Sequence, residues 1–134
     1  MDAIGAEREF ELTLQWADSR LREARNATIS RQARVEAAYD CIHARLLVLL
    51  RRAGEPEPAE YASERVILQG AIAARLSCGC VNELMALHQW AADHGNDPGA
   101  HSFSLPRVFA LGRYLEKKDK WLKMSSNSAS LAAR

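Results

Sequence analysis

Hydrophobic residues recur at every third or fourth position along a central stretch of the chain, residues 28–54. One stripe is made of Val35, Ala38, Tyr39, Ile42, Leu46, Leu49 and Leu50. Leu47 and Val48 widen this apolar surface, so the second half of the stretch is apolar almost all round. A soluble helix with that pattern is covered on several sides by its neighbours. The pattern therefore predicts a long central helix surrounded by other helices.

The same periodicity predicts four further helices around the central one. We expect them at about residues 6–25, 59–76, from the SCGC sequence to about 94, and from about 105 to 124. Thr28 or Ser30 can cap the central helix, and Gly54 is suited to end it. Gly70, inside the third helix, should cost up to about 1 kcal/mol relative to alanine unless a neighbouring backbone packs close to it. Ser104 followed by Pro106 marks the start of the last helix.

These elements predict an all-α fold, a single-domain bundle of about five helices in up-and-down order. The bundle is expected to span residues 1–124, and the polar residues 125–134 are expected to form a flexible tail. Sparse proline and glycine and few β-branched residues favour helix throughout the chain.

The overall charge excludes little, because the formal net charge is only +1. The last predicted helix is more basic, with Arg107, Arg113, Lys117, Lys118, Lys120 and Lys123 against Glu116 and Asp119. No apolar run is long enough to cross a membrane, and the acidic start of the chain does not resemble a signal peptide. The three cysteines are an odd number and indicate free thiols in a reducing compartment. We therefore expect a cytoplasmic protein.

Two local motifs are weak candidates for a metal site. Cys78 and Cys80 are one residue apart, whereas a structural zinc site needs four ligands that are usually more widely spaced. Free thiols in a tight turn are the simpler interpretation. Asp40 and His43 match one of the two carboxylate-x-x-His pairs of a di-iron site, but no second helix carries the other pair. A hydrogen bond from His43 to Asp40 or to a neighbouring helix fits better, and we predict no metal and no cofactor.

Two tryptophan positions indicate surface recognition. Leu12 and Trp16 are four residues apart and lie nearly opposite the Phe10–Leu21 stripe of the first helix. Trp90 is similarly placed off the main stripe of the fourth helix. A helix with two apolar faces either lies inside the domain or meets a partner. Leu12, Trp16 and Trp90 are therefore candidate interface residues, with packing inside the domain as the alternative.

The central helix resembles the core helix of HEPN domains, small helical bundles found in bacterial toxin–antitoxin and defence systems. The matching residues are Arg31, Ala33, Arg34, Ala37, Ala38, Tyr39, His43, Leu46, Leu47 and Leu50. The resemblance covers residues 10–54, and beyond them only the number and length of helices correspond. Ribonucleases of this family carry an arginine and a later histidine with four to six residues between them on a late helix. Here Arg107 is followed at those distances by Gly112, Arg113 and Tyr114 and by no histidine on that helix, so the resemblance implies a non-catalytic copy.

The sequence thus predicts a non-enzymatic interaction module, acting as a homodimer or with a protein partner. The alternative is a degenerate member of the family that binds or processes RNA. Its candidate contacts are Arg107, Arg113, Tyr114, Lys117 and Lys118, on the basic last helix. The arginines of the chain are not interleaved with aromatic residues, so we do not expect a stacking platform for single strands.

Overall fold

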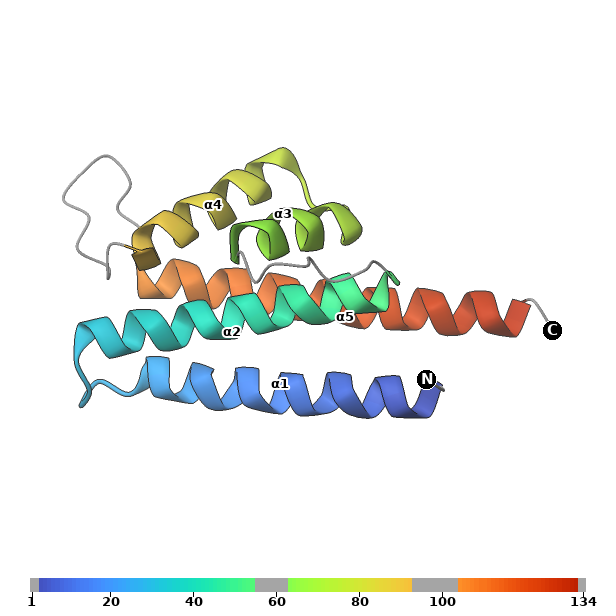
Figure 1. Cartoon of the computed structure of the whole chain (residues 1–134), viewed down its shortest axis with the longest axis horizontal. Helices are drawn as coiled ribbons and strands as arrows, with labels where there is room; N and C mark the ends of the chain where they lie inside the picture. The colour runs from blue at the N-terminus through green and yellow to red at the C-terminus, as the bar shows by residue number, and fades with distance from the viewer. Residues whose placement is uncertain (1–2, 55–62, 93–103, 133–134) are drawn as a thin grey trace.

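The computed structural model describes residues 3–54, 63–92 and 104–132, and this part of the chain is helical without strands. Its helices are α1 (Ala3–Arg25), α2 (Arg31–Arg52), α3 (Ser63–Ala73), α4 (Cys78–Ala92) and α5 (Leu105–Ala132). The predicted all-α bundle is confirmed. The helices do not follow a strict up-and-down order, because α3 runs in the same direction as α2 (Figure 1).

The central position of α2 is confirmed by burial along its whole length. Val35, Ile42, Leu46 and Leu49 are inaccessible to solvent or nearly so. In Figure 1, α1 lies along one side of α2, α3 and α4 cover the opposite side, and α5 runs beside it. The wide apolar surface that the sequence places on this helix is therefore used to pack against all its neighbours.

Close packing of α3 on α2 depends on Gly70. A Cβ atom at this position would lie 3.0 Å from the backbone oxygen of Leu46, closer than normal packing allows. The structure therefore has the close neighbouring backbone that makes a glycine favourable at this position. Helix α3 is shorter than predicted, since it ends at Ala73 and Arg75 adopts a left-handed φ of 55°. The first predicted residues of this helix, 59–62, lie outside the described residues.

Side-chain caps set several helix ends. The Ser30 hydroxyl accepts a hydrogen bond from the Ala33 N–H at 3.1 Å, and Gly54 has a φ of 75°, as a helix-terminating glycine should. The Ser77 hydroxyl likewise accepts from the Cys80 N–H. The CGC sequence is therefore the first turn of α4 and not a separate tight turn, which corrects the sequence interpretation.

Helix α5 differs from the prediction at its C-terminal end. It begins at Leu105, as predicted from Ser104 and Pro106, but it continues to Ala132, beyond the expected end near residue 124. The expectation of a flexible tail remains a prediction.

A partly buried ion-pair network ties α1, α2 and α5 together. The Arg52 guanidinium, whose side chain is 9% exposed, hydrogen-bonds Asp119 of α5 and Glu7 of α1. It also lies 4.8 Å from the ring centroid of Phe10. Lys123 of α5 also pairs with Glu7, at 3.0 Å. Hydrogen bonding from Arg52 is the main reason that the pKa of Glu7 is lowered.

Candidate interaction surfaces

A groove beside α1 exposes two large apolar side chains. Leu12 is 57% exposed and Trp16 is 50% exposed. Both line a groove of about 410 Å³. We call its lining the α1–α2 surface; it consists of Leu12, Thr13, Trp16, His43, Ala44 and Leu47. Exposed large apolar side chains next to a concave surface are typical of protein interfaces.

Contacts on the other face of α1 fix the position of this surface. Phe10, Ala17 and Ala24 are buried at intervals of two helical turns. Two ion pairs also connect α1 with α2, Asp18 with Arg45 at 2.9 Å and Arg20 with Asp40 at 2.8 Å. Because these contacts hold α1 from the inside, Leu12 and Trp16 are left on its outer side. The sequence prediction of two apolar faces on this helix is confirmed.

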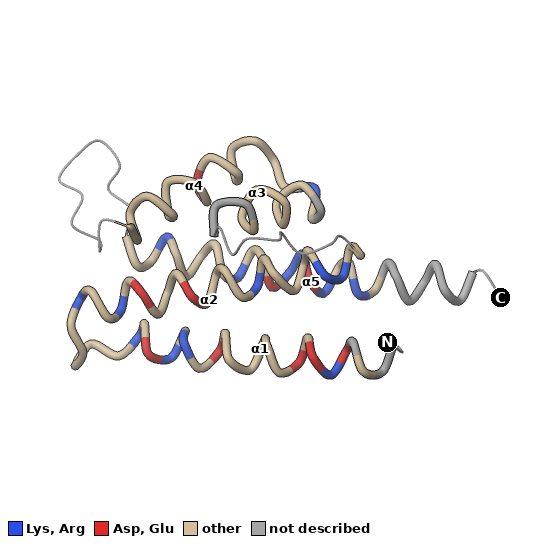
Figure 2. Tube along the Cα trace, in the orientation of Figure 1, with Lys and Arg blue, Asp and Glu red and all other residues tan. Residues whose placement is uncertain are grey.

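A second surface, on α5, combines aromatic rings with cations. Arg107, Tyr114, Lys118 and Trp121 follow one another at intervals of seven, four and three residues, which places them along one side of the helix. We call these four residues the α5 surface. The Lys118 ammonium lies 6.0 Å from the ring centroid of Tyr114 and 5.5 Å from that of Trp121. Figure 2 shows the cations of α5 along the helix, whereas α3 and α4 carry few charges.

Trp121 is the residue that sequence reasoning missed. It is 50% exposed, and Tyr114 is 39% exposed. Sequence reasoning considered only the arginines and overlooked the Tyr-Lys-Trp spacing on the last helix. That spacing was the available signal.

The remaining predicted RNA contacts differ in their surroundings. Arg107 forms an ion pair of 2.8 Å with Glu83 of α4, and both line a groove of about 520 Å³ between α4 and α5. Arg113 and Lys117 are exposed. The Arg107 charge is therefore partly compensated within the chain, and the uncompensated positive charge lies further along the helix.

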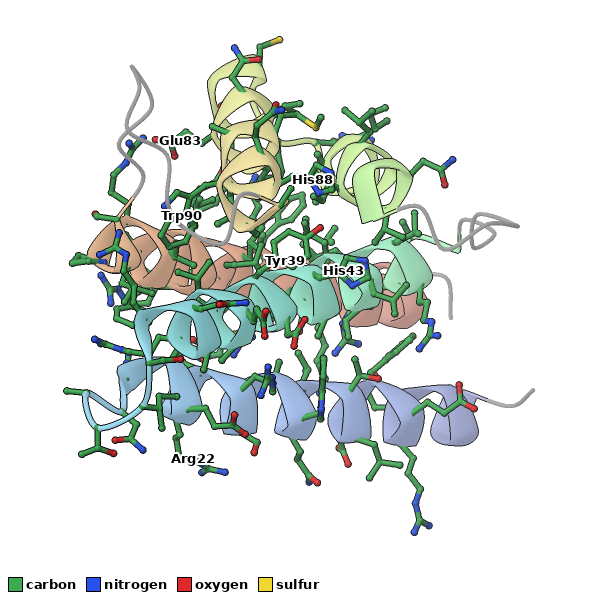
Figure 3. All side chains as sticks on the ribbon, turned by 60° about the vertical axis from the view of Figure 1, so that its left-hand side comes forward. Arg22, Tyr39, His43, Glu83, His88 and Trp90 are labelled. Carbon is green, nitrogen blue, oxygen red and sulfur yellow. The ribbon has the colours of Figure 1, made fainter. Side chains whose placement is uncertain are left out.

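Three ring side chains meet where α2 faces α3 and α4 (Figure 3). The Tyr39 hydroxyl and Nδ1 of His88 are 2.9 Å apart, at hydrogen-bonding distance. The His43 ring lies beside Tyr39, and its buried Nε2 has no hydrogen-bond partner. Asp40 accepts a hydrogen bond from Arg20, and the predicted bond from His43 to Asp40 is not formed. Burial lowers the pKa of His43, which keeps the ring neutral at physiological pH.

The cysteines and Trp90 give no support to the other predicted sites. All three thiols are free, and burial raises the pKa values of Cys41 and Cys80. Across residues 3–54, 63–92 and 104–132, no three His, Cys, Asp or Glu side chains form a group that could hold a metal. Trp90 is only 2% exposed and packs in the core, which removes it from the candidate interface.

Comparisons of this chain with family models, with curated proteins and with solved structures found no match. The likeness to HEPN domains therefore rests on the residues of the central helix alone. None of the described helices is long and apolar enough to span a lipid bilayer.

Proposed function

We propose that this protein is a non-catalytic interaction module that forms a homodimer through the α1–α2 surface. The observation that carries the proposal is the exposure of Trp16 and Leu12 at the edge of an apolar groove. Tryptophan is enriched among the residues that dominate binding energy at protein interfaces. The proposal also accords with the HEPN resemblance, in which a copy without the Arg/His motif acts through association.

The arrangement of the titratable groups supports association rather than catalysis. Glu7 and Arg52 belong to the network between helices, while Cys41 and His43 are held in or beside the core. Residues with perturbed pKa values indicate an active site when they converge in one cleft. These groups are distributed over separate parts of the described structure and do not converge in one cleft.

The test uses two tryptophans that are equally exposed. Sedimentation equilibrium at increasing protein concentration should show a monomer–dimer equilibrium for the wild type. Trp16→Ala should weaken it by about 30-fold, the effect of losing an interface anchor. Trp121→Ala, which removes a side chain of the same 50% exposure, should leave it unchanged. A wild type that stays monomeric at high micromolar concentration contradicts the proposal.

A second function, binding of single-stranded RNA, is favoured by one observation on α5. Lys118 lies over both exposed rings of the α5 surface, an arrangement that combines base stacking with attraction to phosphate. Under this proposal, Trp121→Ala lowers affinity for an unstructured RNA oligonucleotide by about 5- to 100-fold. Trp16→Ala serves as the control and should bind normally.

Salt dependence separates this second function from nonspecific adhesion. Affinity measured by fluorescence anisotropy should fall steeply as salt is raised, because phosphate contacts release counterions. Arg107→Ala should make that slope shallower. If the oligonucleotide is not retained even at low salt, the RNA proposal is wrong and the dimer proposal is unaffected.

A further inference from the structure

We propose that the two copies of the dimer pack α1 against α1 in antiparallel orientation; this inference rests on the proposed function. Helix α1 spans Ala3–Arg25, so its midpoint is Leu14. Leu12 and Trp16 lie two residues on either side of that midpoint. When two such helices overlap fully in antiparallel orientation, Leu12 of each copy faces Trp16 of the other. The exposed apolar pair is therefore self-complementary, as a twofold interface requires.

The charges of α1 favour the same orientation. Its N-terminal half carries Glu7, Glu9 and Glu11 against Arg8, and its C-terminal half carries Arg20, Arg22 and Arg25 against Asp18 and Glu23. The two halves therefore have formal net charges of −2 and +1. Antiparallel packing brings the unlike halves together, whereas parallel packing would bring like halves together. Complementary potentials select orientation more than they add affinity.

Two specific pairs of opposite charge follow from full overlap. Arg8 lies six residues before the midpoint and Glu23 nine after it, an offset of about 4.5 Å along the axis that both long side chains can span. Glu9 lies five residues before the midpoint and Arg20 six after it, which places them almost level. Each pair occurs twice in a symmetric dimer.

The two N-terminal members of these pairs are available, whereas Glu23 and Arg20 already form an ion pair with each other. Arg8 and Glu9 are exposed and form no ion pair within the described part of the chain. Glu23 is half-exposed and shares Arg20 with Asp40. Glu7, by contrast, is directed to Arg52 and Lys123 and takes no part. Arg8 and Glu9 would therefore gain ion-pair partners when a second copy packs against α1.

Charge reversal tests the orientation. Arg8→Glu and Glu23→Arg should each weaken dimerisation by about fivefold or more at low salt, because each places like charges opposite one another twice. The double variant should recover wild-type affinity to within about twofold. A mixture of the two single variants should form a heterodimer at least as stable as the wild-type dimer. Lys117→Glu, a charge reversal on α5, is the control and should have no effect.

The outcomes distinguish the inference from the function on which it rests. A monomeric wild type overturns both. A dimer that Trp16→Ala weakens, but that neither single charge reversal affects, keeps the proposed function and overturns the antiparallel arrangement. In a parallel dimer, each single reversal and the double variant would bind like the wild type, and only the mixture would bind more tightly. Circular dichroism of each variant confirms that the helices are intact, and recovery in the double variant excludes misfolding as the cause of a loss.

Discussion

The α1–α2 surface and the α5 surface present tryptophans of equal exposure in different chemical surroundings. Trp16 lies beside Leu12 at an apolar groove, whereas Trp121 lies beneath the ammonium of Lys118. Both side chains are 50% exposed. Exposure alone therefore does not indicate the partner. The neighbouring side chains do, because an apolar groove favours another protein surface and a cation beside an aromatic ring favours an anionic ligand.

The largest effect is expected at Arg52, which supports both surfaces. Arg52→Ala leaves the carboxylate of Asp119 buried without its partner, and the free energy of unfolding should fall by about 3–5 kcal/mol. Urea denaturation of this variant and of Arg113→Ala, an exposed arginine, measures the difference. The control should change stability by less than about 0.5 kcal/mol. Equal effects of the two substitutions would show that the network does not join α1 to α5.

Gly70 should affect stability while leaving both surfaces intact. Gly70→Ala forces a Cβ against the Leu46 backbone oxygen and should cost about 1–3 kcal/mol, reduced by the better helix propensity of alanine. Gly79→Ala is a matched control, since its Cβ would meet only the Ser77 hydroxyl at 3.9 Å. Thermal unfolding should separate the two variants, and the folded fraction of Gly70→Ala should still dimerise. Loss of dimerisation would mean that α3 shapes the α1–α2 surface.

The smallest effect is a pH dependence that originates at His43. Burial lowers the pKa of this ring below its usual value of 6.5, so the unfolded chain binds a proton more readily than the native one. Its contribution to stability is complete above pH 6.5 and is lost as the pH falls through the lowered pKa. Glu7, whose pKa lies below 4.5, loses its contribution only at lower pH. Between pH 6.5 and pH 4.5, the denaturation midpoint should fall less steeply with decreasing pH for His43→Leu than for the wild type. An equal pH dependence of the two proteins would contradict the assignment to His43.

The sequence predicted those parts of the fold that depend on local periodicity. The burial of Val35, Ile42 and Leu46 follows from their spacing, and the caps at Ser30 and Gly54 follow from local chemistry. The direction of α3 did not follow, because the same apolar stripe packs equally well in either orientation. The end of α5 was also misjudged, since a polar sequence can continue a helix that has already been nucleated.

The candidate surfaces were only partly predictable. The position of Leu12 and Trp16 opposite a buried stripe could be read from helical spacing. The same reasoning failed for Trp90, because α4 packs against both α2 and α3 and Trp90, although off its main stripe, lies in the core. The partners of Asp119 and Lys123 also depended on tertiary structure. Asp119 pairs with Arg52 and Lys123 with Glu7, and neither contact can be read from spacing within one helix.

Fluorine NMR of protein labelled with 5-fluorotryptophan tests the central claim most directly, since each of the three tryptophans gives one resonance. The resonances are assigned with single Trp→Phe variants and followed through a dilution series without added ligand. If the dimer forms through the α1–α2 surface, the Trp16 resonance should shift with protein concentration while those of Trp90 and Trp121 stay fixed. Three resonances independent of concentration, or a shift of Trp121 in place of Trp16, would contradict it.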